Sequence, residues 1–146
     1  MQVPATVLMI LLSSPISGNA GDDCTDATAV QLGTSFFNTS TYSDSDVPVE
    51  GNCVYMGEMS RDIWMSFTPE VDGLITASTC APGSFDTSII VYQNQQCSCD
   101  DLLYVACNGD TYLDPACQAY HSEVDFIASG GSEYLFRIGG YSNDEG

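Results

Sequence analysis

The residues that could carry out catalysis in this chain are few, and the first candidates form the tripeptide Asp86-Thr87-Ser88. Aspartic proteases place a D-T-[GS] tripeptide at the end of a strand, where two carboxylates share one proton and act as acid and base. That chemistry needs a second copy of the tripeptide or a dimer, and this 146-residue chain has no second copy between hydrophobic residues. We therefore interpret the tripeptide as the start of a strand.

A Ser-His-Asp triad would have to use His121, because it is the one histidine in the chain. Its surroundings, A-Y-H-S at 119–122, contain no nucleophile elbow of the form G-x-S-x-G. We expect His121 to be a surface or loop residue, and we expect the chain to have no catalytic activity of its own.

Metal binding by carboxylates is the other chemistry to consider. The chain has 20 Asp and Glu residues but only two basic residues, Arg61 and Arg137, which gives a net charge of −18. Ca²⁺ is a hard cation that takes several oxygen ligands. No segment fits the D-x-[DN]-x-[DN]-G calcium loop, so a site would have to be assembled from separate loops. We place the candidate calcium ligands at Asp86, Asn108 and Asp110, with a turn or cap as the alternative role of each. The other oxygen ligands considered are Asp44, Asp46, Glu50, Asp62, Asp100 and Asp101.

The acidity also limits the partners. A chain of this charge repels phosphate backbones and anionic lipid surfaces, which argues against nucleic-acid binding. A solvated acidic surface that keeps an extracellular protein in solution is the alternative to calcium binding. Carbohydrate binding would need exposed aromatic side chains, and several tyrosines fall in or near predicted loops. They are Tyr42, Tyr55, Tyr104, Tyr112, Tyr120 and Tyr141.

The N-terminus predicts a secretory signal peptide at residues 1–20. Its apolar run V-L-M-I-L-L at 7–12 is too short to span a bilayer, and S-G-N-A at 17–20 offers small residues before a cut after Ala20. The positive charge that usually precedes such a run is missing, and a buried N-terminal strand is the alternative. We expect an exported protein, extracellular or at the cell surface, with no transmembrane segment in the mature chain.

Cysteine usage agrees with export. Disulfides persist in oxidising surroundings. A cysteine in a disulfide has no thiolate, so export also argues against a catalytic cysteine. The spacings lack the paired C-x-x-C of a zinc ribbon, and an odd number leaves one thiol for an intermolecular bond or a partner outside this chain. Spacing alone does not reveal the pairing. The seven cysteines are Cys24, Cys53, Cys80, Cys97, Cys99, Cys107 and Cys117.

The elements that must position these residues are all strands. Turn sequences such as A-P-G-S at 81–84 and S-G-G-S at 129–132 separate short segments in which apolar residues alternate with polar ones. The predicted fold is one domain, residues 21–146, an antiparallel β-sandwich of jelly-roll type with about eight strands. The predicted strands are 27–32, 34–38, 62–68, 73–79, 87–93, 102–107, 123–128 and 133–138. The predicted core contains Ile63, Trp64, Phe67, Ile75, Ile90, Tyr92, Val124, Phe126 and Phe136.

The final segment G-G-Y-S-N-D-E-G at 139–146 is turn-like and no apolar stretch follows it. A sandwich that stopped there would leave its last strand without the neighbour that such a turn normally introduces. We expect the domain to lack its last strand, or the chain to continue in a longer product.

Seven ordered blocks along the predicted mature chain resemble a known family. They are D-C at 23–24, R-D-I-W-M-S-F-T-P at 61–69, T-C at 79–80, S-F-D-T at 84–87 leading into I-V-Y at 90–92, A-C-N at 106–108, S-E-V-D-F at 122–126, and Y-L-F-R-I-G-G at 134–140. The pattern resembles secreted bacterial β-sandwich domains related to the pre-peptidase C-terminal domain, which are found in planctomycete surface proteins. Two features depart from the family pattern. This chain has N-G-D at 108–110 where the family has an asparagine followed by two acidic residues, and the closing strand is absent.

The resemblance implies a non-catalytic module attached to a larger exported protein, where it assists secretion, adhesion or the binding of polysaccharide or protein surfaces. Some relatives bind Ca²⁺. The missing closing strand often ends in cysteine, so the resemblance would leave Cys24 without a partner. The alternative function is a fragment of a secreted peptidase or hydrolase whose catalytic domain lies outside this chain, and a purely structural surface component is a third.

Overall fold

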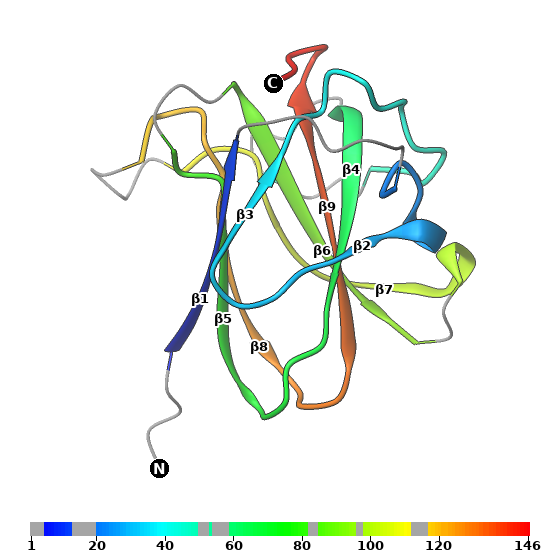
Figure 1. Cartoon of the computed structure of the whole chain (residues 1–146), viewed down its shortest axis with the longest axis vertical. Helices are drawn as coiled ribbons and strands as arrows, with labels where there is room; N and C mark the ends of the chain where they lie inside the picture. Colours follow the sequence, from blue (N-terminus) through cyan, green and yellow to red (C-terminus); the bar gives the residue numbers. More distant parts are fainter. Residues whose placement is uncertain are drawn as a thin grey trace.

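The computed structural model describes residues 5–12, 20–49, 53, 59–81, 85–95, 98–111 and 117–146. These residues form nine strands in two sheets, which confirms the predicted all-β class (Figure 1). None of the helices in these ranges is long and apolar enough to cross a membrane. The strands are β1 (Ala5–Leu12), β2 (Thr28–Ala29), β3 (Thr34–Phe37), β4 (Met59–Phe67), β5 (Gly73–Ser78), β6 (Thr87–Asn94), β7 (Leu102–Asn108), β8 (Glu123–Ala128) and β9 (Glu133–Tyr141). The 3-10 helices η1 (Cys24–Asp26) and η2 (Cys99–Asp101) precede β2 and β7.

The five-stranded sheet has the order β2-β4-β9-β6-β7, and its long pairs are antiparallel. The four-stranded sheet has the order β3-β1-β5-β8, with β5 and β8 antiparallel. Strands β2 to β9 correspond to the eight predicted strands, although the first of them is reduced to two residues. The pairing departs from the predicted antiparallel sandwich at the two-residue β2, which is parallel to β4, and at β1, which lies outside the predicted domain and is parallel to both β3 and β5.

The hydrophobic core has two parts because the five-stranded sheet is buried on both faces. Between the sheets, alternate residues such as Ile63 of β4, Val91 of β6 and Phe136 of β9 pack together. On the outer face, Trp64 of β4 packs with Tyr92 of β6, their ring centroids 5.8 Å apart. All nine predicted core residues are buried.

The outer face of the five-stranded sheet is covered by the segment between β3 and β4. A bulge in β4 at Arg61, whose φ of 47° is in the left-handed region, separates the two parts of the β4–β9 ladder. At this bulge the backbone N–H of Arg61 donates to Asp44, 2.8 Å away, and Ser45 donates to Asp62. Half-buried Val47 packs against the Trp64 cluster, so this loop completes the outer part of the core.

Three disulfides join distant parts of the chain. Cys24 pairs with Cys99 and Cys53 with Cys107, each with Cα atoms 5.9 Å apart, and Cys80 pairs with Cys117 at 4.8 Å. The expectation that Cys24 is left over is therefore wrong, because η1 and η2 place Cys24 beside Cys99. Six of the seven cysteines are paired, and the seventh, Cys97, lies outside the described residues.

Candidate functional site

Part of the sequence-predicted site lies in segments at one end of the sandwich, toward the top of Figure 1: Asp86, Asn108, Asp110, Tyr120 and Tyr141. We call this the upper end and define it by residues 79–81, 85–86, 108–111, 117–122 and 141–146. Residues 85–86 lead into β6 and 117–122 precede β8, while 108–111 begin with the last residue of β7 and 141–146 with the last residue of β9. Antiparallel neighbours begin and end at the same edge, so segments distant in sequence meet here.

Asp86 is held at the centre of the upper end by its backbone. Its carbonyl oxygen accepts a hydrogen bond from Tyr141 N at 3.1 Å, and the next residue, Thr87, donates its N–H to Tyr120 O at 2.9 Å. The backbone of Asp86 is therefore fixed between the segment that precedes β8 and the segment that follows β9.

The carboxyl group of Asp86 has an altered proton affinity. Partial burial, followed by the negative charges of Asp110 and Asp144, raises its pKa from 3.8 to about 6. The structure thus brings together two of the three predicted calcium ligands, Asp86 and Asp110. It adds Asp144, which sequence reasoning missed because only the turn after β9 carries it to this place.

Asn108, the third predicted ligand, has a structural role. Its side-chain oxygen accepts a hydrogen bond from Glu123 N, and its side-chain nitrogen donates to Asp110 O, both at 3.2 Å. The amide thus joins the turn after β7 to the first residue of β8, which is the alternative role considered for it.

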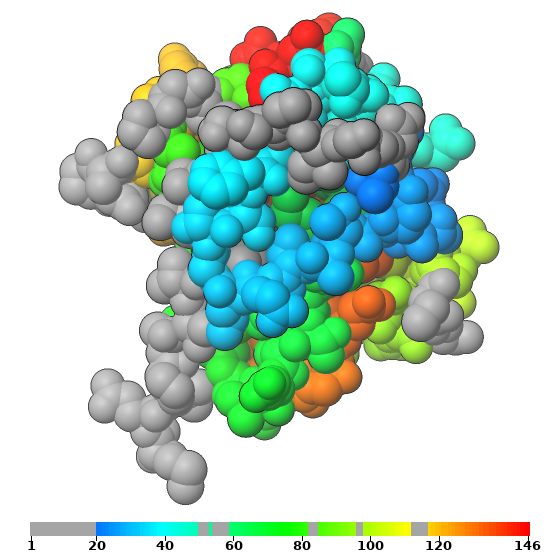
Figure 2. Space-filling model, in the orientation of Figure 1, coloured from blue at the N-terminus to red at the C-terminus, as the bar shows by residue number. Residues whose placement is uncertain are grey.

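Two exposed tyrosines lie on either side of Asp86, because their backbones hydrogen-bond to Asp86 and Thr87. Tyr120 is 61% exposed and Tyr141 is 43% exposed. Figure 2 shows the segments that carry them, gold near residue 120 and red near the C-terminus, at the same end of the molecule. Both are among the tyrosines predicted for carbohydrate binding. Tyr104 is also exposed, whereas Tyr42 is half-buried against the core, and Tyr55 and Tyr112 lie outside the described residues.

His121 is 1% exposed, so the expectation of a surface histidine is wrong. It does lie in a loop, but Cys117 of that loop is disulfide-bonded to Cys80, and the loop folds back over the end of β5. The N–H of Ala81 donates to His121 Nδ1 at 3.3 Å, so that this nitrogen acts as an acceptor without a proton. The imidazole has a structural role here.

The tripeptide at 86–88 is the start of a strand, as interpreted from the sequence. Thr87 and Ser88 are buried, and the hydroxyl oxygens of Thr87 and Thr79 are 2.6 Å apart. The Ser122 hydroxyl donates to the carbonyl of Thr87 at 2.5 Å. These hydroxyl groups satisfy one another at the point where β5, β6 and β8 meet, which is a structural use of the side chains.

The other candidate carboxylates are dispersed. Asp62 is buried in an ion pair with Arg137, and Asp44 caps the bulge at Arg61. Asp46 is exposed in the loop before β4, Asp100 and Asp101 are exposed on η2, and Glu50 lies outside the described residues. The strands bring none of the described carboxylates of this group to Asp86.

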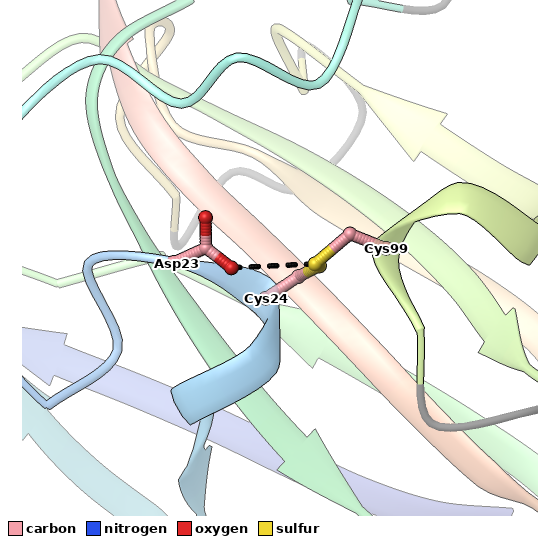
Figure 3. Close-up of side chains that lie close together, drawn as sticks. All are labelled: Asp23, Cys24 and Cys99. Carbon is pink, nitrogen blue, oxygen red and sulfur yellow. Dashed lines mark hydrogen bonds between the residues drawn. A yellow bond between two sulfur atoms is a disulfide. The ribbon is translucent and has the colours of Figure 1, made fainter.

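Among the described residues, one group of three potential metal-ligating side chains comes within 4.8 Å: Asp23, Cys24 and Cys99 (Figure 3). The two sulfur atoms form a disulfide and therefore offer no thiolate. Asp23 Oδ1 lies 3.3 Å from Cys99 Sγ, a contact that is a hydrogen bond only if the thiol is reduced. The same carboxylate caps η1 by accepting the N–H of Thr25 at 2.9 Å. This cluster is structural in the oxidised protein.

A shallow groove of about 310 Å³ lies near the opposite end of the sandwich. It is lined by the β4–β5 turn, with Pro69 and Val71, and by Leu32 before β3. Its floor reaches the core residues Phe67 and Ile75. The groove contains none of the sequence-predicted site residues.

Comparison of the chain with protein-family models, curated proteins and solved structures finds no match.

Proposed function

We propose that this protein is a secreted, non-catalytic accessory module that binds a polysaccharide or protein surface outside the cell. One contrast at the upper end carries the proposal. The histidine that a catalytic triad would use, His121, is buried and accepts a hydrogen bond from the backbone of Ala81, while Tyr120 and Tyr141 at the same end are exposed.

The chemistry of the upper end suits sugars. A tyrosine ring offers an apolar face that can stack on the C–H face of a pyranose, and its hydroxyl group can hydrogen-bond. Carboxylates such as Asp110 and Asp144 accept hydrogen bonds from sugar hydroxyls. The net charge of −18 repels anionic polysaccharides, so the proposed ligand is neutral or basic.

Export is supported by the three disulfides, which are stable in an oxidising compartment. They also support the reading of residues 1–20 as a signal peptide, which stays a prediction. The resemblance to domains related to the pre-peptidase C-terminal domain adds that such a module works while attached to a larger protein.

The alternative is a fragment of a secreted peptidase or hydrolase. It differs from the proposal only in what shares the polypeptide, because in both cases the sandwich itself performs no catalysis. Reading the coding DNA past the codon for Gly146 distinguishes them: a peptidase or hydrolase domain in frame favours the alternative.

The binding test uses insoluble neutral polysaccharides (cellulose, chitin and starch) and collagen fibres, with the retained protein measured after centrifugation. We expect retention on at least one of them. Replacing Tyr120 and Tyr141 together with Ala should weaken that binding about tenfold, since each aromatic contact contributes about 0.5–1.5 kcal/mol.

The matched control is Tyr104→Ala, which removes an exposed tyrosine from β7 and should leave binding unchanged. Retention that survives the double substitution would place the binding surface elsewhere. Hydrolysis of peptide or glycoside substrates by the purified chain alone would refute the non-catalytic assignment.

A further inference from the structure

β1 fills a slot between two strands that are far apart in the sequence. In the order β3-β1-β5-β8, it alone connects β3 to the rest of its sheet. Residues 9–12 are in register with 34–37 of β3, and residues 5–9 with 74–78 of β5. Without β1, the facing backbone edges of β3 and β5 lose their hydrogen-bond partners.

The strand that fills this slot lies inside the predicted signal peptide. If the chain is cut after Ala20, β1 leaves with the peptide and the slot opens. The slot borders the core between the sheets, since Phe37 of β3 and Ile75 and Ala77 of β5 are buried there. Exposing such residues to water is unfavourable by about 25 cal/mol for each Å² of apolar surface, so the opened domain favours a new strand in the slot.

The direction of β1 is the second observation. Apart from the two-residue pairing of β2 with β4, the other described strand pairs are antiparallel. An antiparallel ladder is slightly more stable for each residue than a parallel one. A strand running opposite to β1 would make the four-stranded sheet antiparallel throughout.

A strand antiparallel to β3 would enter the slot near the C-terminal end of β3, where Thr39 and Gly146 are hydrogen-bonded to each other. The N–H of Thr39, two residues after β3, donates to Gly146 O at 2.6 Å, and Gly146 N donates to Thr39 Oγ1 at 3.2 Å. Figure 1 shows the C-terminus beside the tips of β1 and β3. Backbone just after β3 can therefore form hydrogen bonds with a segment from outside this sheet.

We propose that the slot between β3 and β5 is a strand-acceptor site, which after loss of residues 1–20 binds an extended segment of a partner protein antiparallel to both strands. The segment has apolar residues at alternate positions, facing Ile75 and Ala77, and no proline within the ladder. β5 offers six residues, so the inserted part is of that length.

Charge favours a partner over a second copy of this chain. Residues 1–20 contain no charged residue, so the chain keeps its net charge of −18 after their loss. Two copies repel each other, whereas a neutral or basic partner segment is attracted. This inference goes beyond the proposed function because it concerns attachment to a polypeptide and does not depend on the ligand of the upper end.

The test begins with the full chain carrying a specific protease site within residues 13–19, so that after cutting only the ladder holds β1. The probe, added in excess, is a fluorescent synthetic peptide, L-L-I-M-L-V-T-A between lysine pairs, which has the residues of β1 in reverse order so that an antiparallel strand presents the same side chains. We expect its anisotropy to rise with cut protein and not with uncut protein, whose slot is filled. Hydrogen exchange should show β3 and β5 amides protected in the cut complex.

The control peptide carries proline in place of the leucine that corresponds to Leu8. Proline lacks the N–H that the ladder needs, so binding should weaken about tenfold or more. A photo-crosslinker at the N-terminus of the probe reports its direction. Crosslinks near Thr39 and Gly146 support the antiparallel orientation, and crosslinks near Gly73 overturn it.

A cut protein that unfolds as its own peptide leaves, and refolds when the probe is added, also supports the proposal. Direct pairing of β3 with β5 in a cut protein that stays folded and binds no probe would overturn it. A cut protein that ignores the probe and forms a dimer in sedimentation would overturn the partner segment in favour of a second copy.

Discussion

Arg137 of β9 and Asp62 of β4 form a buried ion pair, with 2.5 Å between Nε and Oδ2 and side chains 2% and 0% exposed. Arg137 also donates to the carbonyl of Val47 at 2.6 Å, and its guanidinium lies 5.6 Å from the Trp64 ring centroid. Asp62 accepts the N–H of Ser45 at 2.9 Å. One pair therefore joins the two strands to the loop that covers them, and it takes one of the two basic residues of the chain out of solvent.

Replacing Asp62 with Asn should strongly destabilise the fold. The substitution leaves the charge of Arg137 buried without its counter-ion, and breaking a buried pair in this way costs about 3–5 kcal/mol. The free energy of unfolding in urea measures the loss. The matched control is Glu145→Gln, which makes the same charge change at the exposed Arg61–Glu145 pair and should cost less than about 1 kcal/mol. Equal losses in the two variants would show that burial does not govern the contribution of the Asp62 pair.

Asp86 should make the protein less stable as the pH rises. Its pKa in the folded protein, about 6, is above the unfolded value of 3.8, so the folded state binds this proton more tightly. The stabilisation is complete below pH 3.8 and is lost as the pH rises through about 6. Asp86→Asn should therefore raise the melting temperature at pH 7 and have little effect at pH 3.5. Asp101→Asn, at an exposed position on η2, is the control and should not reproduce this dependence on pH.

Calcium binding at the upper end stays a prediction with a direct test. A cation shared by Asp86 and Asp110 would lower the pKa of Asp86 and raise the melting temperature. At 100 times its dissociation constant, Ca²⁺ would stabilise the fold by about 2.7 kcal/mol. Asp110→Asn should abolish the effect and Asp101→Asn should preserve it. Identical melting curves in chelator and in millimolar Ca²⁺ would end the calcium hypothesis.

Cysteine mapping should find one free thiol per chain. The three disulfides use six of the seven cysteines, and the seventh, Cys97, lies outside the described residues. Alkylation in denaturant without reductant, followed by peptide mass spectrometry, should modify Cys97 and recover Cys24 joined to Cys99. An intermolecular disulfide through Cys97 would instead give a covalent dimer that reductant converts to monomer. A peptide pair joining Cys24 to Cys97 would contradict the pairing.

The strands were predictable because their signals are local. In β4, Ile63 and Met65 alternate with Trp64 and Ser66, and this period of two marks a strand regardless of what covers its faces. Trp64 could be assigned to the core for its size and its apolar flanks. The prediction did not foresee that the outer face is a second core, because its cover comes from a loop without periodicity.

The candidate site was predictable only in part. Asp86 and Asp110 were identified as oxygen ligands near strand ends, and their proximity follows from β6 and β7 being neighbours. Asp144 and the burial of His121 were missed, because each depends on how a loop folds back over the sheet edge.

The all-β class, the acidity, the strand positions and most of the core could be derived from the amino-acid sequence, because these depend on composition and on residues two apart. Which residues distant in the chain meet could be learned only from the folded protein. Cys24 pairs with Cys99, and Asp62 with Arg137, each across 75 positions. Strand order and loop path bring those pairs together, and no local pattern encodes them. The same reason explains β1: its apolar run is compatible with a leader or a strand, and only the open edges of β3 and β5 supply the partners that make it a strand.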